Sequence, residues 1–251
     1  MRAADMLCSL RHVQARFVPS GREWENGQQE SLDTMPIRTN VYLRRAERED
    51  LDTVVDWMED PDFLHFLYGD PTRSPKRIRE QIVGMLGRTG GNTMPGGLYF
   101  IIDSADYGPI GLISVQQISW RNRSCNIDTY IGNKKLRAGF ASAVALYRAL
   151  EYVFHELNMH RVTLVVYSFN AASWRLVERS GAVRELVMRE HVPRDGELHD
   201  MFGYGILRPE FDTLREEVAE RFPEMLLEAN KHAQEQAEAK AEAQKTAENG
   251  S

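Results

Sequence analysis

The spacing of apolar residues changes along the chain and predicts a series of short strands and helices. Alternating or continuous apolar runs predict strands at 41–46, 98–103, 108–118 and 124–132. The last three follow one another across short polar turns, which is typical of an antiparallel meander. Before them, Asp50 can cap one helix, and Ser74 followed by Pro75 predicts the start of a second. The first of these helices would bury Leu51, Val54 and Met58.

In the second half of the chain the period lengthens to that of a long amphipathic helix. Apolar residues recur at helical spacing at Ala143, Leu146, Tyr147, Leu150, Val153, Phe154 and Leu157. The segment 161–167 is apolar on both faces, which predicts a buried strand parallel to the one at 124–132. A short helix closed by Gly181 and two strands around an Asp195–Gly196 turn complete the pattern. The order of elements predicts an α/β domain of about 170 residues.

Composition divides the chain into three parts. Residues 1–36 are polar and aperiodic, which predicts a flexible N-terminal extension. The periodic segments predict one folded domain at 37–212. Residues 213–251 are rich in Ala, Glu, Gln and Lys and poor in large apolar residues, so we expect a charged helical or disordered tail.

Charge and cysteine content exclude several classes of function. The 251 residues include 37 acidic and 31 basic ones, so no global basic field is available to hold nucleic acid. No run of about 18 apolar residues predicts a membrane span. Cys8 and Cys125 are too few for a disulfide framework and are not spaced as zinc ligands. We therefore expect a cytoplasmic protein without metal, nucleic-acid or membrane partners.

One turn carries candidate chemistry. In the stretch IGNKKLRAGFASAVALYRAL, a predicted strand enters a small-residue turn that opens directly into the long helix. Such a turn presents unpaired backbone N–H groups at the positive end of a helix dipole, where phosphate binds. Gly139 and Ala141 let a ligand approach closely, and Lys134, Lys135 and Arg137 add positive charge. Taken alone, this pattern is more often a structural turn than a phosphate site.

The stretch from this turn to Ala182 resembles the core of the GNAT superfamily of acyl-CoA-dependent N-acetyltransferases. In that family a strand leads to the signature Gln/Arg-x-x-Gly-x-Gly/Ala, a long helix, a strand, an asparagine and a short helix. Gly139 and Ala141 match the small positions and Asn170 the asparagine, whereas Leu136 stands where the signature has Gln or Arg. The resemblance implies an α/β GNAT fold, with a mixed sheet of about seven strands, splayed at the cofactor site and flanked by about four helices.

The resemblance also implies where acetyl-CoA, the co-substrate, binds. Its pyrophosphate would lie on the amides of residues 137–142, and its pantetheine arm would run between the strands at 124–132 and 161–167. The acyl carbonyl would meet a backbone N–H near Tyr130 or Ile131. The implied cofactor-binding residues are Tyr130, Ile131, Arg137, Ala138, Gly139, Phe140, Ala141, Ser142, Asn170 and Ser173.

The same comparison suggests which side chain serves the leaving thiolate. Many relatives use a tyrosine in the helix after the asparagine, but Val177 occupies that position here. The branch with ribosomal-protein N-terminal (alanine/serine) acetyltransferases instead has Asn-x-x-Ser, which Asn170 and Ser173 match, so this branch is the most similar. Ser173 would then protonate or hydrogen-bond the thiolate. A serine that is satisfied locally within its helix is an equally good interpretation.

Three residues are candidates for the general base. The predicted strand at 124–132 places Asp128 on one face, where an unpaired carboxylate would be unfavourable unless it borders a wet cleft. A salt bridge from Asp128 to Arg121 or Arg123 explains it equally well. The other candidates, on the strand that follows the short helix, are Glu190 and His191.

The sequence leaves the acceptor open. The implied reaction transfers an acetyl group to a primary amine by direct attack in a ternary complex, and the amine could belong to an amino sugar, a polyamine, an antibiotic or a protein N-terminus. The acidic run Glu59, Asp60, Asp62 and Asp70 would suit a cationic acceptor, although a solvated helix end accounts for it better. A homodimer is possible. The alternative is a degenerate CoA-binding regulatory or interaction module, because Leu136 and Val177 depart from the family markers.

Overall fold

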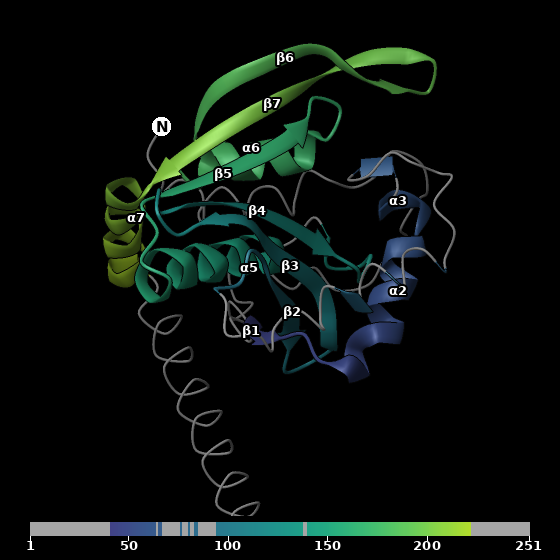
Figure 1. Cartoon of the computed structure of the whole chain (residues 1–251), viewed down its shortest axis with the longest axis horizontal. Helices are drawn as coiled ribbons and strands as arrows, with labels where there is room; N and C mark the ends of the chain where they lie inside the picture. Colours follow the sequence, from purple (N-terminus) through teal and green to yellow (C-terminus); the bar gives the residue numbers. More distant parts are fainter. Residues whose placement is uncertain are drawn as a thin grey trace, which may run out of the picture.

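The protein is built on a mixed sheet of seven strands (Figure 1). The computed structural model describes residues 41–63, 65–66, 76, 80, 83–84, 94–137 and 140–221. The strands are β1 (Val41–Arg45), β2 (Leu98–Ser104), β3 (Gly108–Ser119), β4 (Ser124–Ile131), β5 (Arg161–Tyr167), β6 (Val183–Arg194) and β7 (Glu197–Leu207). They lie in the order β1-β2-β3-β4-β5-β7-β6, and among these described strands only β4 and β5 pair in parallel. The predicted splayed, mixed sheet and its meander are confirmed.

Helices cover both faces of the sheet. They are α2 (Leu51–Glu59), α3 (Pro61–Phe63), α5 (Phe140–Glu151), α6 (Ala171–Arg179) and α7 (Arg208–Arg221), with a 3-10 turn η2 (Arg48–Asp50) and a π-helical turn η5 (Tyr152–Glu156) that continues α5. The predicted helix that starts at Ser74 lies almost wholly outside the described residues. Within the part of the chain that the structure describes, no helix is long and apolar enough to cross a membrane.

The start of α2 differs from the prediction. Asp50 directly precedes the helix, but its side chain makes no cap hydrogen bond to it. Instead the carboxylate accepts two bonds of 2.7 Å from the guanidinium of Arg44 on β1, and one of 2.9 Å from the Glu47 amide. A bidentate, charge-assisted pair is stronger than a single hydrogen bond to a backbone amide, so the Asp50 side chain pairs with Arg44 and does not cap the helix.

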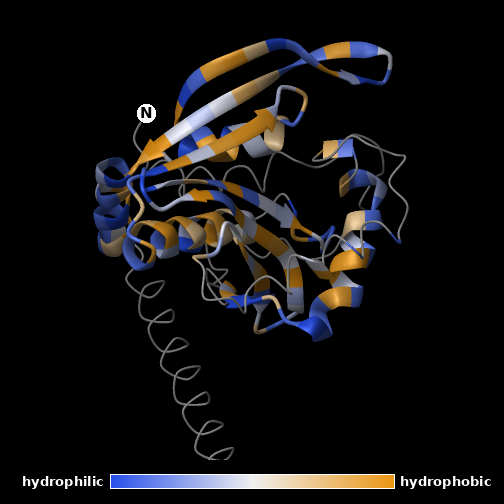
Figure 2. Cartoon of the chain, viewed as in Figure 1, coloured by the Kyte–Doolittle hydropathy of each residue, from blue (hydrophilic) through white to orange (hydrophobic). Residues whose placement is uncertain are grey.

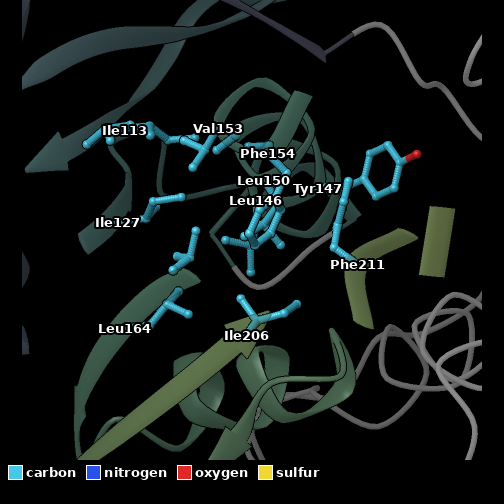
Figure 3. Packing of buried hydrophobic residues seen from close by; sticks show 14 of the residues in the cluster. Ile113, Ile127, Leu146, Tyr147, Leu150, Val153, Phe154, Leu164, Ile206 and Phe211 are labelled. Carbon is cyan, nitrogen blue, oxygen red and sulfur yellow. The ribbon is translucent and has the colours of Figure 1, made fainter. Parts of the chain in front are cut away.

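The two faces of the sheet pack against different helices. On one face, Ile113, Ile127 and Leu164 join one hydrophobic cluster with α5 (Figure 3). On the other face, Ile101 and Tyr130 join a second cluster with α2. The division follows the two-residue period of a strand. As a result, the polar residues of β4 that share a face with Tyr130 lie on the α2 side of the sheet.

The last described helix, α7, belongs to the folded core. Its residues Phe211, Leu214 and Val218 are all buried and pack in the α5 cluster, while the helix as a whole is mostly hydrophilic (Figure 2). Oδ1 of Asp212 also lies 3.2 Å from Nε2 of His155 in η5. The folded part therefore continues past residue 212, the predicted domain end, because apolar residues at helical spacing persist for two more turns.

The sheet is split in its middle. β4 and β5 pair only at Ser124–Arg161, Cys125–Val162 and Asn126–Thr163. Beyond these pairs β4 follows β3 and β5 follows β7, so the two strands diverge (Figure 1). The facing edges of β4 and β5 then carry backbone groups without a strand partner, which an extended ligand can use.

Candidate active site at the split between β4 and β5

The backbone of β4 alternates between its two neighbours. A Cβ added to Gly111 of β3 would lie 2.3 Å from the carbonyl oxygen of Tyr130, so that carbonyl points towards β3. Successive residues of a strand direct their backbone groups to opposite edges. Ile131 therefore faces the split, and its carbonyl indeed accepts a 2.8 Å bond from Nε of Arg137 on that side. Of the two predicted N–H groups, the one that faces the split is that of Ile131.

The turn after β4 is held by its own polar groups. Oδ1 of Asn133 accepts the Lys135 amide at 3.1 Å, and its carbonyl accepts the Leu136 amide at 3.0 Å. Ser142, which is buried in the first turn of α5, donates its hydroxyl to the carbonyl of Arg137 at 2.9 Å. The Ser142 side chain thus ties the helix to the turn, and only its backbone remains for a ligand.

The departure at Leu136 has a structural explanation. Its side chain is partly buried against the large core cluster, as is Ala141 in the first turn of α5. An apolar residue here anchors the turn to the core, where the family signature has a polar one. Ala138 and Gly139, the centre of the predicted cradle, lie outside the described residues, and Phe140 begins α5.

Two of the three positive charges of the turn already have partners. Arg137 forms ion pairs with Asp60 and Asp62, and Lys134 lies 3.3 Å from Asp60 and 3.5 Å from Asp62. Lys135 is exposed. In this structure the Arg137 side chain therefore contacts the end of α2 and the start of α3. The same pairs neutralise two members of the acidic run.

Asp128 lies on β4 beside the split, on the α2 face. Its side chain is exposed, yet surrounding protein raises the pKa of the carboxyl by desolvation, against a lowering by Ser114. The Ser114 hydroxyl lies 3.4 Å away and Nε2 of Gln116 donates at 3.2 Å. Within the described residues Asp128 pairs with no arginine, and Arg123 instead donates to Asn158. The predicted salt bridge of Asp128 does not form with Arg123.

Asn170 and Ser173 meet at the start of α6. Asn170 is the N-cap, and its side chain accepts the Ser173 amide at 3.3 Å. The half-buried Ser173 hydroxyl makes no hydrogen bond to any described residue, so no bond within its own helix occupies it. Val177, at the position of the family tyrosine, is buried in the core cluster and offers no hydroxyl group.

Glu190 and His191 lie on the outer edge strand. Both are exposed, on an irregular stretch of β6 where Glu190 has a φ of 53° and its amide bonds Asp200. Because β5 and β7 lie between β6 and β4, the structure does not bring these residues next to Asp128.

Two polar residues that contact Asp128 were not predicted from the sequence as site residues. Ser114 is opposite Asp128 in the β3–β4 register, and Gln116 is opposite Asn126. Their signal is present in the sequence: a serine and a glutamine two positions apart, in a strand whose other face is apolar, mark a polar face.

Comparison with known proteins identifies the family. A family model described as an acetyltransferase (GNAT) domain matches residues 40–183. The SPbeta prophage-derived uncharacterized N-acetyltransferase YokL of Bacillus subtilis is 28% identical over 69% of this chain and 93% of its own length. The spermidine N(1)-acetyltransferase of Vibrio cholerae is 24% identical over 70% of this chain and 97% of its own.

A solved structure has the same fold. The spermidine N-acetyltransferase from Vibrio cholerae in complex with CoA and spermine superposes with a TM-score of 0.62 at 22% identity, covering 69% of this chain and 98% of that one. Together with the match over more than half of the chain and the split sheet, these findings show that the chain belongs to the GNAT family of acyl-CoA-dependent N-acetyltransferases.

Proposed function

We propose that the protein transfers an acetyl group from acetyl-CoA to a primary amine by direct attack in a ternary complex. The observation that carries this proposal is the placement of Asp128 beside the split: an accessible carboxyl on the same strand as a free backbone edge. An acceptor amine can approach from the α2 face while the thioester lies along the strand edge. The Ile131 N–H then donates to the carbonyl oxygen as it becomes an oxyanion.

Two side chains serve the proton transfers. Asp128 accepts a proton from the attacking nitrogen, for which a raised carboxyl pKa is suited. As the C–N bond forms and the C–S bond breaks, CoA leaves as the thiolate, to which the Ser173 hydroxyl donates a hydrogen bond, while Asn170 caps the helix start. The backbone amides at the start of α5 would hold the pyrophosphate of acetyl-CoA.

We propose a small-molecule amine, with a polyamine as the first probe, as the acceptor. The spermidine acetyltransferase of Vibrio cholerae, which this chain matches over 97% of that protein's length, supports this choice. Asp60 and Asp62 are neutralised by Arg137 and Lys134, so Asp128 is the carboxylate offered to a cationic acceptor at this point. A ribosomal-protein or other N-terminus remains the competing acceptor, and we propose a cytoplasmic location.

The test begins with calorimetric titration of acetyl-CoA, followed by thiol release with spermidine, an amino sugar, an aminoglycoside and peptides with N-terminal alanine or serine. We expect binding, and fastest release with spermidine. Asp128→Asn and Glu190→Gln separate the candidate bases, and Ser173→Ala tests the thiolate donor. If acetyl-CoA does not bind, the proposed reaction is excluded. If peptides react and spermidine does not, the acceptor is a protein N-terminus.

A further inference from the structure

The side chain of Arg137 reaches the end of α2 and the start of α3. Its Nε donates to the Ile131 carbonyl at 2.8 Å, and one terminal nitrogen donates to Asp60 at 3.0 Å. The other terminal nitrogen donates to Asp62. One guanidinium thus joins the last residue of β4 to the end of α2 and the start of α3.

The Asp60 carboxylate is held in an orientation that faces the Arg137 guanidinium. Oδ1 of Asp60 accepts the Asp62 amide at 2.9 Å, which fixes its orientation, and its Oδ2 faces Arg137 and Lys134. The Asp60 side chain is only 13% exposed and that of Arg137 only 23%. Burial alone would raise the pKa of Asp60, but the hydrogen bonds from the Asp62 amide, Arg137 and Lys134 outweigh it and lower the pKa.

An aromatic layer supports the same contact. The Arg137 guanidinium carbon lies 5.1 Å from the centre of the Tyr130 ring, and Nη2 of Arg137 donates a hydrogen bond to the Tyr130 hydroxyl. Phe63 of α3 packs edge-on against Tyr130, with ring centres 4.6 Å apart. Trp57 of α2 packs so closely on Gly132 that an added Cβ would lie 2.3 Å from the indole nitrogen. The end of β4 and the α2–α3 corner therefore form one packed unit.

We propose that Arg137 is a positioning residue that fastens the α2–α3 corner to the end of β4, and is not a ligand of the CoA pyrophosphate. If its guanidinium turned to a phosphate, Asp60 would keep, among the described residues, only the exposed Lys134 as a cationic partner while remaining largely buried, which is unfavourable. The proposal rests on the proposed function, since the corner lies on the face from which the acceptor would approach. It makes Arg137 a determinant of acceptor binding.

The first experiment separates a positioning role from phosphate binding. Dissociation constants of CoA and of pantetheine, which lacks the pyrophosphate, are measured by calorimetry for the wild type, Arg137→Gln, Asp60→Asn and the exposed control Arg121→Gln. We expect the ratio of the two constants to be the same in all four proteins within about threefold. A loss of CoA affinity of about tenfold or more in Arg137→Gln, with pantetheine unaffected, would show a phosphate ligand and overturn the proposal.

The second experiment follows the acceptor. With spermidine as the amine, we expect Arg137→Gln and Asp60→Asn each to raise the acceptor KM about tenfold while the KM of acetyl-CoA stays unchanged. The double variant should be no worse than the poorer single variant, because both remove one contact. Arg137→Lys, which keeps the charge, should raise the acceptor KM less than Arg137→Gln does. Additive losses, or equal changes in both KM values, would contradict the proposal.

A readout without catalysis keeps the two hypotheses apart. The urea midpoints of wild type, Arg137→Gln, Asp60→Asn and the double variant form a cycle that needs no substrate. If the changes in urea midpoint are non-additive but the wild type does not bind acetyl-CoA, the proposed function is refuted while the contact between Arg137 and Asp60 is still supported. Additive midpoints would show that the two residues do not support one another, and the proposal would fail even in an active enzyme.

Discussion

The desolvation of Asp128 raises the pKa of its carboxyl, which favours proton acceptance but destabilises the charged form in the folded protein. Its carboxyl is desolvated and held by two neutral partners, Ser114 and Gln116, with no cation among its described contacts. A carboxylate stabilised by an arginine would have a depressed pKa and would be a poor proton acceptor. Because Arg123 bonds Asn158 and not Asp128, the carboxyl keeps a raised pKa, which suits the proposed role of general base.

Replacement of Asp128 should remove the base. We expect Asp128→Asn to lower kcat/KM by about 10²- to 10⁴-fold, because an amide cannot accept the proton. In the wild type the activity should rise with pH through the raised pKa of Asp128, and the variant should lack this limb. The measurement is thiol release across a pH series. An unchanged rate in the variant would leave water or another group as the base.

The same substitution should stabilise the fold above the pKa. Because the pKa of Asp128 is higher in the folded protein than in the unfolded chain, its stabilising contribution is present at low pH and is lost as pH rises through the folded value. Thermal denaturation should thus give a higher Tm for Asp128→Asn than for the wild type at pH 8, and a smaller difference near pH 3. A lower Tm at pH 8 would contradict the desolvation of this carboxyl.

Gly132 should tolerate no side chain. A Cβ there would overlap the Trp57 indole, whereas Gly96 has open space around it. We expect Gly132→Ala to reduce the free energy of unfolding by about 1–3 kcal/mol through overpacking. Gly96→Ala should change it by less than about 0.5 kcal/mol. Urea denaturation compares them, and Trp57→Leu in the same chain as Gly132→Ala should recover part of the loss.

At the scale of elements, the sequence predicted what local periodicity determines. The strands, the parallel return to β5, and the turn at Asp195 and Gly196, both with positive φ, followed from apolar spacing and turn residues. The end of the domain did not, because Ala- and Glu-rich composition obscured two buried positions of α7. The partners of Asp50 and Arg137 are set by which elements lie side by side, and no local pattern encodes that.

The site shows the same division. Asp128, Asn170 and Ser173 could be placed because strand alternation and a cap residue fix them locally. Glu190 could not, because its distance from β4 depends on the strand order, in which β7 is inserted between β5 and β6. The ion pairs of Arg137 could not be predicted from the sequence either, because its carboxylate partners lie some 75 positions earlier in the chain.

Helix α7 should contribute substantially to stability. Leu214 is 3% exposed and packs in the core cluster, whereas Glu216 on the same helix is exposed. We expect Leu214→Ala to lower the free energy of unfolding by about 2–5 kcal/mol, because it leaves a cavity. Glu216→Ala should change it by less than about 0.5 kcal/mol. Equal, small effects in urea denaturation would mean that α7 is not part of the cooperative unit.

At the scale of the whole molecule, the β6–β7 hairpin leaves apolar side chains uncovered. Leu186 is 50% exposed and Leu198 58% exposed, and β6 is the outer edge of the sheet. We propose that a second copy covers this hairpin in a homodimer, since an exposed apolar edge strand favours pairing.

Sedimentation velocity tests this assembly. Leu186→Glu combined with Leu198→Glu should shift the protein towards monomer, because charges would be buried in the contact. Tyr107→Ser, which changes an exposed aromatic residue at the β2–β3 turn, should leave the distribution unchanged. A wild type that sediments as a monomer at all concentrations would exclude the dimer.

The split between β4 and β5 has a consequence for amide hydrogen exchange. In an intact sheet neighbouring residues of a central strand exchange at similarly slow rates, but here the Tyr130 amide faces β3 and the Ile131 amide faces the opening. Slowly and rapidly exchanging amides should therefore alternate along the end of β4, although this strand lies in the middle of the sheet. A pantetheine chain seated in the opening would slow only the fast set, so the pattern of protection would record the path of the ligand without a crystal.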